Sequence, residues 1–424
     1  MLGKIKRALY FPFASYFAFF ARIKLKRWNP KVIVITGSSG KTTVLHLLES
    51  QIGEEAYYSH KANSSYGIPF NILGMERGTL SKWEWPLLFL KTPFAAYGSV
   101  PAQKIYVAEV DCDRPSEGLF LATLLKPHTT LWISSSRSHS VNFDHCVTEG
   151  TCDTVEEAVA KEYGSLLEYT QDTVYYNGDN PLIKSQAHRT HAQIHEIIMN
   201  ASIFKYTVFK NKTDFTIGET TYTFNYLLPQ ELFYGLSMVL DITLKLGLPI
   251  DTTFSRLELP PGRNSLFTGT KDTTLIDGSY NANLSSMAAV LSLFEKYPAH
   301  NKWIVLGGLL DQGKSEVEEH EKLAALIPPI SPKKVILFGQ RANTYIYPKL
   351  KVSLDGKCDI VKFETQRQVL EFLQSNLKGE ETILFKGGTL LEGVIEHLLA
   401  DKEDVSKLCR REKIWQLRRQ KAGL

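Results

Sequence analysis

The stretch VIVITGSSGKTTVLHLLES, residues Val32–Ser50, decides the fold of the first half of the chain. Its β-branched start predicts a buried strand, and the apolar spacing after Lys41 predicts a helix. Between them, Gly37 and Gly40 stand where the chain must bend tightly and let backbone N–H groups face an anion. The positive end of the helix dipole points at the same place, so the stretch predicts a phosphate-binding loop.

The side chains of this loop favour a nucleoside triphosphate over other phosphates. Lys41 is placed to reach the β- and γ-phosphates, and the Thr42 hydroxyl is placed to bind Mg²⁺. We therefore expect ATP or GTP binding, with a purely structural turn as the alternative. The predicted nucleotide-binding residues of the loop are Gly37, Ser38, Ser39, Gly40, Lys41, Thr42 and Thr43.

The composition is that of a globular protein without a dominant charge. The 424 residues suggest two or three domains, and 43% hydrophobic with 22% charged residues is ordinary for such proteins. A net charge of +4 is small for this length, so no nucleic acid is expected as a partner. The five cysteines form no CxxC pair, which favours a reduced, cytoplasmic setting. His139, His145, Cys146 and Cys152 crowd together, but their spacing matches no common zinc motif.

Strand-like runs alternate with helical patterns along most of the chain, which predicts an α/β protein with mostly parallel sheets. The predicted strands are Val32–Ile35, Lys104–Glu109, Thr130–Ile133, Val174–Tyr176, Thr274–Ile276, Lys302–Leu306, Lys334–Phe338 and Thr382–Phe385. Phe204–Tyr226 has the pattern of an antiparallel meander, and the Pro-Pro-Gly turn in Glu258–Asn264 is the best domain boundary. We therefore expect an N-terminal helix in residues 1–30, a P-loop central domain in residues 31–259, and a Rossmann-like α/β domain with a basic tail in residues 260–424.

The N-terminal segment combines an apolar centre with basic ends. Ala8–Ala21 is mostly apolar but shorter than the ~20 residues that a membrane-spanning helix needs. A signal peptide would end in a small-residue cleavage site, and a basic cluster follows here instead. The flanking basic residues are Lys4, Lys6, Arg7, Arg22, Lys24, Lys26 and Arg27. Two interpretations stay open, namely a helix lying on an anionic membrane surface and an aromatic helix packed on the body of the protein.

The spacing of the phosphate loop is informative. The longer GxxxxGK[ST] pattern would need a glycine at position 35, where this chain has Ile35. The shorter form TGxxGKTT, directly after a strand, resembles the Mur ligase family. The resemblance covers about residues 31–400, through segments in family order: KANSSYGIPFNILG (Lys61–Gly74), YVAEVDCDRPSEG (Tyr106–Gly118), LWISSSRSHSVNFD (Leu131–Asp144), EEAVAKEY (Glu156–Tyr163), YYNGDNP (Tyr175–Pro181), PPGRN (Pro260–Asn264), TLIDGSYNANLSSM (Thr274–Met287), IVLGGLLDQGKSEVEEH (Ile304–His320) and LFKGGTLLE (Leu384–Glu392).

The resemblance implies an activity and a set of site residues. Family members join an amino acid or peptide to a carboxylate with ATP, through an acyl-phosphate. The implied ligands of Mg²⁺, with two ions expected, are Thr42, Glu109, His139 and a carbamylated Lys161. The implied catalytic residues are Lys41, His139 and Lys161. Closure of the C-terminal domain would bring further ATP-binding residues, which are Arg263, Asp277, Tyr280 and Asn281.

Three features depart from the family pattern. Ser134–Ser136 replaces the usual Thr-Asn-Ile, and Gln230 with Phe233 stands where the family has an asparagine-containing helix start that contacts adenine. Family members of the cell-wall type also carry a nucleotide-sugar domain before the P-loop, and residues 1–30 cannot build one. The resemblance therefore predicts an altered grip on the nucleotide and leaves the carboxylate acceptor open.

The leading hypothesis is an ATP-dependent amide ligase for a cell-wall (peptidoglycan) peptide precursor, resembling family members that add a D-alanyl-D-alanine dipeptide. We expect a cytoplasmic enzyme, with peripheral contact at the inner face of the membrane as an option. Its substrates would be a small-molecule or lipid-linked carboxylate and an amino acid or dipeptide. The alternatives are a ligase for a folate-like or polymeric carboxylate, a P-loop phosphotransferase or NTPase, and a nucleotide-binding structural partner. Lys161 and the second domain favour the ligase, since a kinase or switch has no evident need for them.

Overall fold

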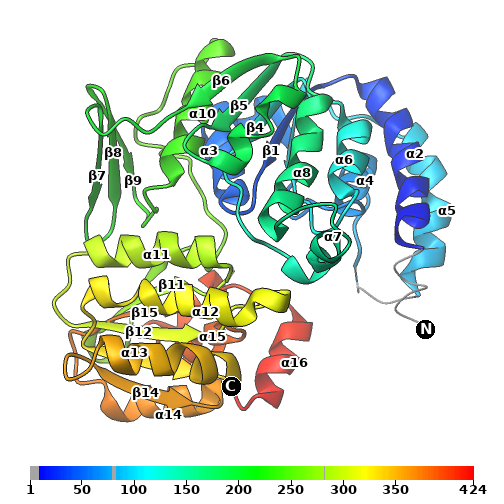
Figure 1. The fold of residues 1–424 in the computed structure, drawn as a ribbon. Helices are drawn as coiled ribbons and strands as arrows, with labels where there is room; N and C mark the ends of the chain where they lie inside the picture. Colours follow the sequence, from blue (N-terminus) through cyan, green and yellow to red (C-terminus); the bar gives the residue numbers. More distant parts are fainter. Residues whose placement is uncertain (1–8, 79–82, 281) are drawn as a thin grey trace. The chain divides into compact units, whose positions relative to one another are not determined.

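The computed structural model describes residues 9–78, 83–280 and 282–424, which form two compact units (Figure 1). Unit 1 comprises residues 1–199, 234–251 and 255–257, and unit 2 comprises residues 200–233, 252–254 and 258–424. The sequence had suggested that residues 200–233 belong to the central domain. They cluster with unit 2 because Val208 and Leu227 share a buried apolar cluster with the first helix after residue 280.

The centre of unit 1 is a six-stranded sheet with the strand order β2-β3-β1-β4-β5-β6. Its strands are β1 (Lys31–Thr36), β2 (Ala56–Tyr58), β3 (Ile105–Val110), β4 (Thr129–Trp132), β5 (Thr173–Asn177) and β6 (Gln193–Ile197). All neighbouring strands are parallel, as predicted. The register pairs Thr36 with both Val110 and Trp132. The loops that follow β1, β3 and β4 therefore begin side by side at the carboxyl edge of the sheet, where ligands bind in open α/β folds.

Helices flank this sheet (Figure 1). They are α2 (Tyr10–Trp28), α3 (Lys41–Ile52), α4 (Gly67–Leu73), α5 (Glu84–Tyr97), α6 (Glu117–Leu125), α7 (Asp144–Thr148), α8 (Val155–Glu168), α9 (Pro181–Lys184) and α10 (Leu232–Lys245). The N-terminal helix α2 packs against α4 and α5 at one side of the unit.

One face of α2 is part of the core of unit 1. Its buried apolar residues are Ala14, Phe17, Ala18, Ala21, Leu25 and Trp28. The Trp28 indole donates a hydrogen bond to the carbonyl oxygen of Gln103, at 2.6 Å. The prediction that this helix packs on the protein is therefore confirmed for this face. Phe13 and Phe19, on the other face, are exposed.

Unit 2 contains a second six-stranded sheet, with the order β10-β11-β15-β12-β13-β14. These strands are β10 (Ser265–Thr268), β11 (Thr274–Gly278), β12 (Lys302–Gly307), β13 (Lys334–Phe338), β14 (Asp359–Phe363) and β15 (Thr382–Lys386). Only the β10–β11 pair within this sheet is antiparallel. A separate antiparallel meander is formed by β7 (Phe204–Val208), β8 (Thr213–Ile217) and β9 (Thr220–Phe224). The predicted α/β class and the predicted meander are both confirmed.

Apolar residues cover both faces of the unit 2 sheet. In β12, Ile304 and Leu306 join one buried cluster, whereas Trp303 and Val305 join another. The first cluster is completed by helices α11 (Leu284–Lys296), α12 (Glu316–Ala325) and α13 (Tyr347–Ser353). The second is completed by α14 (Gln366–Asn376) and α15 (Leu391–Leu398), and the chain ends with α16 (Lys413–Lys421). This alternation gives the doubly wound arrangement of Rossmann-like domains.

Candidate active site

The strand–loop–helix predicted at Val32–Ser50 is present, as β1, the loop 37–40 and α3. Gly37 and Gly40 have φ of 139° and 82°, which side-chain-bearing residues rarely adopt. A Cβ atom on Gly37 would lie 2.7 Å from the carbonyl oxygen of Ser134. Glycine is therefore required at position 37 by both its backbone conformation and the close approach of the loop after β4.

The loop after β4 holds the phosphate loop by direct hydrogen bonds. The backbone N–H of Ser38 donates to the Ser134 carbonyl oxygen at 3.1 Å, and that of Ser39 donates to Ser134 Oγ at 2.9 Å. Ser38 Oγ in turn donates to the Ser136 carbonyl oxygen at 2.9 Å. The serines that replace the family's Thr-Asn-Ile thus contact two of the predicted phosphate-binding residues. Sequence reasoning noted the replacement but did not predict this contact.

Lys41 is buried at the start of α3 and paired with a carboxylate. Its Nζ lies 2.8 Å from Asp111 Oδ2 and donates to the Gly37 carbonyl oxygen at 2.6 Å. Burial by itself lowers the pKa of Lys41, but the charges of Asp111 and Glu109 outweigh it and leave the pKa above its usual value. Burial by itself raises the pKa of Asp111, but the charge and hydrogen bond of Lys41 outweigh the effect of burial and leave this pKa below its usual value. Both groups are therefore charged at neutral pH.

A carboxylate–imidazole group lies beside this ion pair. His139 Nε2 is 3.0 Å from Asp113 Oδ1, and the side chains of Asp111, Asp113 and His139 are close enough together to hold one metal ion. Burial raises the pKa of Asp113, and the neighbouring charge of Asp111 raises it further. A bound dication would relieve this repulsion, and oxygen-rich donors of this kind suit Mg²⁺. The donor set therefore fits the metal that the resemblance implies.

Asp111 and Asp113 are functional candidates that the sequence analysis missed. The resemblance pointed to Glu109 alone, whose backbone N–H donates to Ser59 Oγ at 2.8 Å. Acidic residues occupy every second position, 109, 111 and 113, around the end of β3. This spacing is the sequence pattern from which the two aspartates could have been predicted. Besides Lys41, Tyr163 also holds the Asp111 side chain in place, because its hydroxyl on α8 donates to Asp111 Oδ1 at 2.8 Å.

Glu117, at the start of α6, connects this group to the segment Lys61–Gly74. The buried carboxylate accepts from the backbone N–H of Ser65 at 2.9 Å and from Ser65 Oγ at 2.6 Å. Its other oxygen accepts from the backbone N–H of Asp113 at 3.0 Å. In addition, the N–H of Asp111 donates to the carbonyl oxygen of Asn63 at 2.8 Å. Glu117 therefore positions the segment and Asp113 relative to each other.

Lys161 lies on α8 and extends toward the loop that precedes this helix. Its Nζ donates to the Thr151 carbonyl oxygen at 3.1 Å and lies 3.4 Å from Cys152 Sγ. The next residue, Glu162, accepts hydrogen bonds from the backbone N–H groups of Ser116 and Gly118 at the start of α6. The carbamylation of Lys161 and its contact with a metal stay predictions.

The cysteine–histidine group of the sequence analysis is not assembled around one point. Cys146 Sγ lies 3.8 Å from His145 Nε2, and Cys152 contacts Lys161 instead. Across residues 9–78, 83–280 and 282–424, two groups of three ligand-type side chains are close enough for one ion, and neither contains a cysteine.

The candidate residues of unit 2 gather around the end of β11. Asp277 is fully buried, accepts from the Ser279 N–H at 2.9 Å, and has a pKa raised by burial. The Arg263 guanidinium lies over the ring of Tyr280, 4.6 Å from its centre. On the neighbouring strand β15, burial lowers the pKa of Lys386 to about 8, against the opposing effect of Asp277. Lys386 was missed by the sequence analysis, and Asn281 lies outside the described residues.

The phosphate loop, the buried lysine and the acidic group thus lie together at the carboxyl edge of a parallel sheet, which is the arrangement that the sequence predicted for a nucleotide site. Residues 262–389 match the family model described as "Mur ligase, glutamate ligase domain". The predicted resemblance to Mur ligases is therefore confirmed at the level of this domain.

Whole-chain comparisons point to the same group of proteins. The chain is 23% identical over 392 residues to the UDP-N-acetylmuramoyl-tripeptide--D-alanyl-D-alanine ligase of Bacillus subtilis (strain 168), covering 89% of this chain and 78% of that relative. The protein of the same name from Escherichia coli (strain K12) is 22% identical over 328 residues, covering 74% of this chain and 65% of the relative.

Among solved structures, MurF ligase from Thermotoga maritima in complex with ADP is similar with a TM-score of 0.70 and 19% identity, covering 93% of this chain and 84% of that one. E. coli FolC in complex with DHPP and ADP is similar with a TM-score of 0.57 and 14% identity, covering 88% and 89%. These likenesses support the fold of both units.

Proposed function

We propose that this protein is an ATP-dependent ligase that joins the amine of an amino acid or dipeptide to a carboxylate through an acyl-phosphate. The observation that carries the proposal is the buried Lys41–Asp111 pair at the phosphate loop, beside Asp113 and His139. Phosphoryl transfer to a carboxylate accumulates negative charge, and cationic groups held near the phosphate lower its cost.

The proposed reaction has two steps. In the first step, a carboxylate oxygen attacks the γ-phosphorus of ATP, and the bond between the γ-phosphorus and the bridging β-phosphate oxygen breaks. This step forms the acyl-phosphate and releases ADP. The amine then attacks the acyl carbon, phosphate leaves, and the nitrogen loses a proton as the amide forms. Lys41 contributes a fixed positive charge because its partners keep its pKa high. In the nucleotide complex, we expect its Nζ to exchange the Gly37 carbonyl oxygen for phosphate oxygens.

Metal binding is part of this proposal. Asp111, Asp113 and His139 would hold Mg²⁺, with Thr42 and Glu109 as the further ligands carried by the resemblance. The ion would supply positive charge at the phosphates and relieve the repulsion among the carboxylates. Lys161 is proposed to orient a metal as its carbamate, which requires its amine to leave the Thr151 carbonyl oxygen. The proposed nucleotide-binding residues are Gly37, Ser38, Ser39, Gly40, Lys41, Thr42, Thr43, Arg263, Asp277, Tyr280 and Asn281.

The proposed substrates follow the names of the relatives. A UDP-N-acetylmuramoyl-tripeptide would provide the carboxylate and D-alanyl-D-alanine the amine. A folate-like carboxylate is the second candidate, favoured by the likeness to FolC bound to DHPP. Formation of ADP is measured with each carboxylate, with each amine, and with both. The proposal requires ADP, phosphate and amide in equal amounts when a matching pair is present, and ATP turnover that is indifferent to every pair would overturn it.

A surface of unit 1 supports a second proposal, namely peripheral contact with an anionic membrane. Large apolar residues recur on α5 and just before it at spacings of four and three, which places them along one face of a helix. They are Trp83, Leu87, Leu90, Phe94 and Tyr97, all exposed. Leu90 is 70% and Phe94 80% exposed, whereas Leu88, Thr92 and Ala96 face the core. We name this exposed row, together with Phe13 and Phe19 of α2, the α5 stripe.

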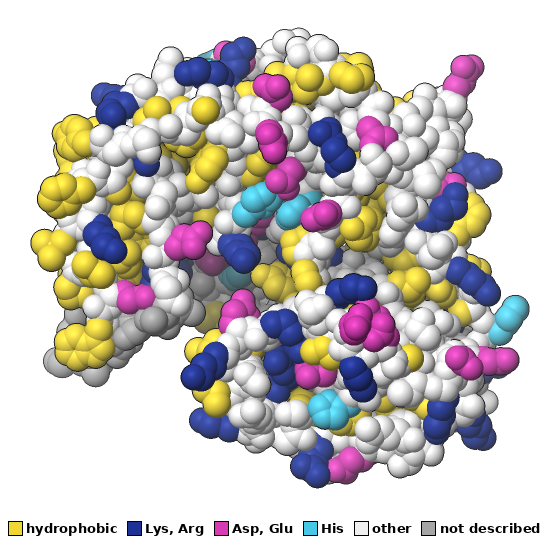
Figure 2. All heavy atoms as spheres, turned by 180° about the vertical axis from the view of Figure 1, so that it is seen from behind, with side chains coloured by type: hydrophobic (Ala, Val, Ile, Leu, Met, Phe, Trp, Pro, Cys, Tyr) yellow, Lys and Arg dark blue, Asp and Glu magenta, His cyan; other side chains and the backbone are white. Residues whose placement is uncertain are grey.

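The α5 stripe favours a membrane by its composition and its surroundings. Apolar side chains gather along the edge formed by α2 and α5 (Figure 2, left). Exposed basic residues lie on the same two helices, namely Arg22, Lys26, Arg27 and Lys91. Each basic residue near an anionic surface contributes about 1 kcal/mol of attraction, and aromatic residues bury at the headgroup level. Within the described ranges, no helix has both the length and the apolar character needed to cross a bilayer.

A truncation of the N-terminus is not a suitable test of this proposal. Removing residues 1–28 would delete core residues such as Phe17 and Trp28, so the truncated chain would fail for structural reasons. The double variant Leu90→Asp/Phe94→Asp instead alters only exposed positions. We expect the unaltered protein to sediment with vesicles containing anionic lipid at low salt and the variant to stay in the supernatant. Two results would refute membrane contact by this stripe. One is equal sedimentation of the unaltered protein and the variant, and the other is a dimer that the unaltered protein forms without lipid and the variant does not form.

A further inference from the structure

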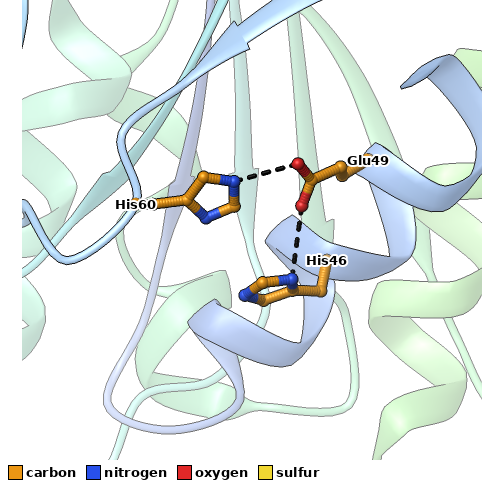
Figure 3. A group of neighbouring side chains, drawn as sticks. All are labelled: His46, Glu49 and His60. Atoms are coloured by element: carbon orange, nitrogen blue, oxygen red, sulfur yellow. Dashed lines mark hydrogen bonds and ion pairs between the residues drawn. The ribbon is translucent and has the colours of Figure 1, made fainter. Parts of the chain in front are cut away.

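A second cluster of ligand-type side chains lies in unit 1, on helix α3 and just after strand β2 (Figure 3). His46 and Glu49 are three residues apart on α3, which places them on the same helix face. His60 follows β2 by two residues and turns its ring toward the same point. Three side chains from two separate elements therefore converge, and none of them belongs to the P-loop site described above.

The distances within this cluster are short. Glu49 Oε2 lies 3.2 Å from His46 Nδ1, and Glu49 Oε1 lies 2.9 Å from His60 Nε2. The two imidazole rings are 5.0 Å apart between centres and tilted by 32°. Zinc binds imidazole nitrogen and carboxylate oxygen at about 2.0–2.2 Å in a tetrahedron, which puts neighbouring ligand atoms about 3.3 Å apart. The two separations involve different oxygens of Glu49, and one ligand atom from each of the three side chains lies within 4.8 Å of the others, which is close enough for one ion to bind all three.

The donor types narrow the choice of metal, and the exposure of the side chains bears on the remaining coordination position. Two imidazoles with one carboxylate suit zinc and neighbouring transition metals, whereas Mg²⁺ prefers a shell of oxygen atoms. The His46 side chain is 15% exposed, whereas Glu49 and His60 are 34% and 40% exposed. A three-ligand site of this kind leaves its fourth position to solvent.

We propose that His46, Glu49 and His60 bind a transition-metal dication of the zinc type, separately from the Mg²⁺ group at Asp111, Asp113 and His139. Such an ion would fasten the chain after β2 to α3, the helix that begins with Lys41. It would therefore stabilise unit 1 around the phosphate loop. The competing explanation is a cluster held only by hydrogen bonds, in which the Glu49 carboxylate accepts from both rings.

The experiment measures Zn²⁺ binding to the full chain after treatment with a chelator. Titration calorimetry is run with Mg²⁺ in excess, so that the acidic group is already occupied. The unaltered protein is compared with His60→Ala and Glu49→Gln, both of which change partly exposed side chains. His191→Ala is the matched control, because it removes an exposed histidine of the same unit outside the cluster.

We expect His60→Ala and Glu49→Gln to lose one Zn²⁺ equivalent, or to bind it more than about 100-fold more weakly, since loss of outer-shell partners alone weakens metal sites by about 10–100-fold. His191→Ala and the acidic-group variant Asp113→Asn should keep this equivalent. Zn²⁺ should also raise the unfolding temperature of the unaltered protein and leave that of His60→Ala unchanged. Equal stoichiometry and affinity in His60→Ala and the unaltered protein would overturn the proposal.

Discussion

Replacing Lys41 by methionine tests whether the Lys41–Asp111 pair organises the phosphate loop. Methionine keeps most of the apolar stem and removes the charge and the hydrogen bond to the Gly37 carbonyl oxygen. Both partners are largely buried, and the ionised oxygen and nitrogen are 2.8 Å apart. Removing one partner of such a pair leaves an uncompensated charge, which costs about 3–5 kcal/mol of unfolding free energy. We expect a loss in this range at neutral pH, together with loss of ATP turnover.

The pH dependence of this loss has a definite sign. The pKa of Asp111 in the folded protein lies below the ordinary value of 3.8, because the lowering effect of Lys41 is larger than the raising effect of burial. The stability that Asp111 contributes through the pair is therefore complete above that ordinary pKa and disappears as the pH falls through the lowered value. The stability difference between the unaltered protein and Lys41→Met should accordingly shrink in strongly acidic solution.

The assay is urea unfolding followed by circular dichroism, with hydrogen exchange at the amides of β1 to isolate unit 1, since two units can unfold separately. Asp111→Asn and the double variant Lys41→Met/Asp111→Asn complete a cycle. We expect the double variant to lose less than the sum of the single variants, by about 1–3 kcal/mol of coupling. Single-variant losses below about 0.5 kcal/mol, or additive losses, would refute the account of the pair.

Three further variants test other contacts of the site. Gly37→Ala should abolish ATP binding measured by calorimetry, because its Cβ would meet a carbonyl oxygen at 2.7 Å, while Gly150→Ala, which also has positive φ but open space, should bind normally. Lys161→Ala should lose ligase activity and regain part of it with added formate, and full activity without formate would refute the carbamate. Glu117→Gln should lower the unfolding free energy by about 1–3 kcal/mol, because an amide donor would then face N–H donors such as that of Asp113. An unchanged urea midpoint would contradict this reading.

The phosphate loop was predictable because its determinants are local. Strand, glycines, lysine and helix all lie within Val32–Ser50, so their order alone fixes their geometry. The central strands of both sheets were equally clear, because strands buried on both faces are continuous apolar runs. The edge strands β2, β6, β10 and β14 were missed. In β6 and β14, polar and apolar residues are mixed and none is fully buried, so neither strand forms a continuous apolar run.

The partner of Lys41 could not be predicted from the chain alone. The pair depends on the register that sets Ile35 beside Glu109, between one strand that ends at Thr36 and another that begins at Ile105. The resemblance emphasised Glu109, whereas the structure brings Asp111 to the lysine. The N-terminal helix was ambiguous for a related reason. Aromatic residues occur all around it, and its buried face is distinguished from its exposed one by packing against α4, α5 and α6.

The central claim is that ATP activates a carboxylate as an acyl-phosphate, and transfer of ¹⁸O tests it most directly. The acceptor, first UDP-N-acetylmuramoyl-tripeptide and then a folate-like acid, is labelled in its carboxylate oxygens and incubated with ATP, Mg²⁺ and the amine. An acyl-phosphate intermediate passes one carboxylate oxygen to the phosphate released, so mass spectrometry should find one ¹⁸O in phosphate for each amide formed. Unlabelled phosphate beside a labelled amide, or phosphate release that does not require both substrates, would contradict the account.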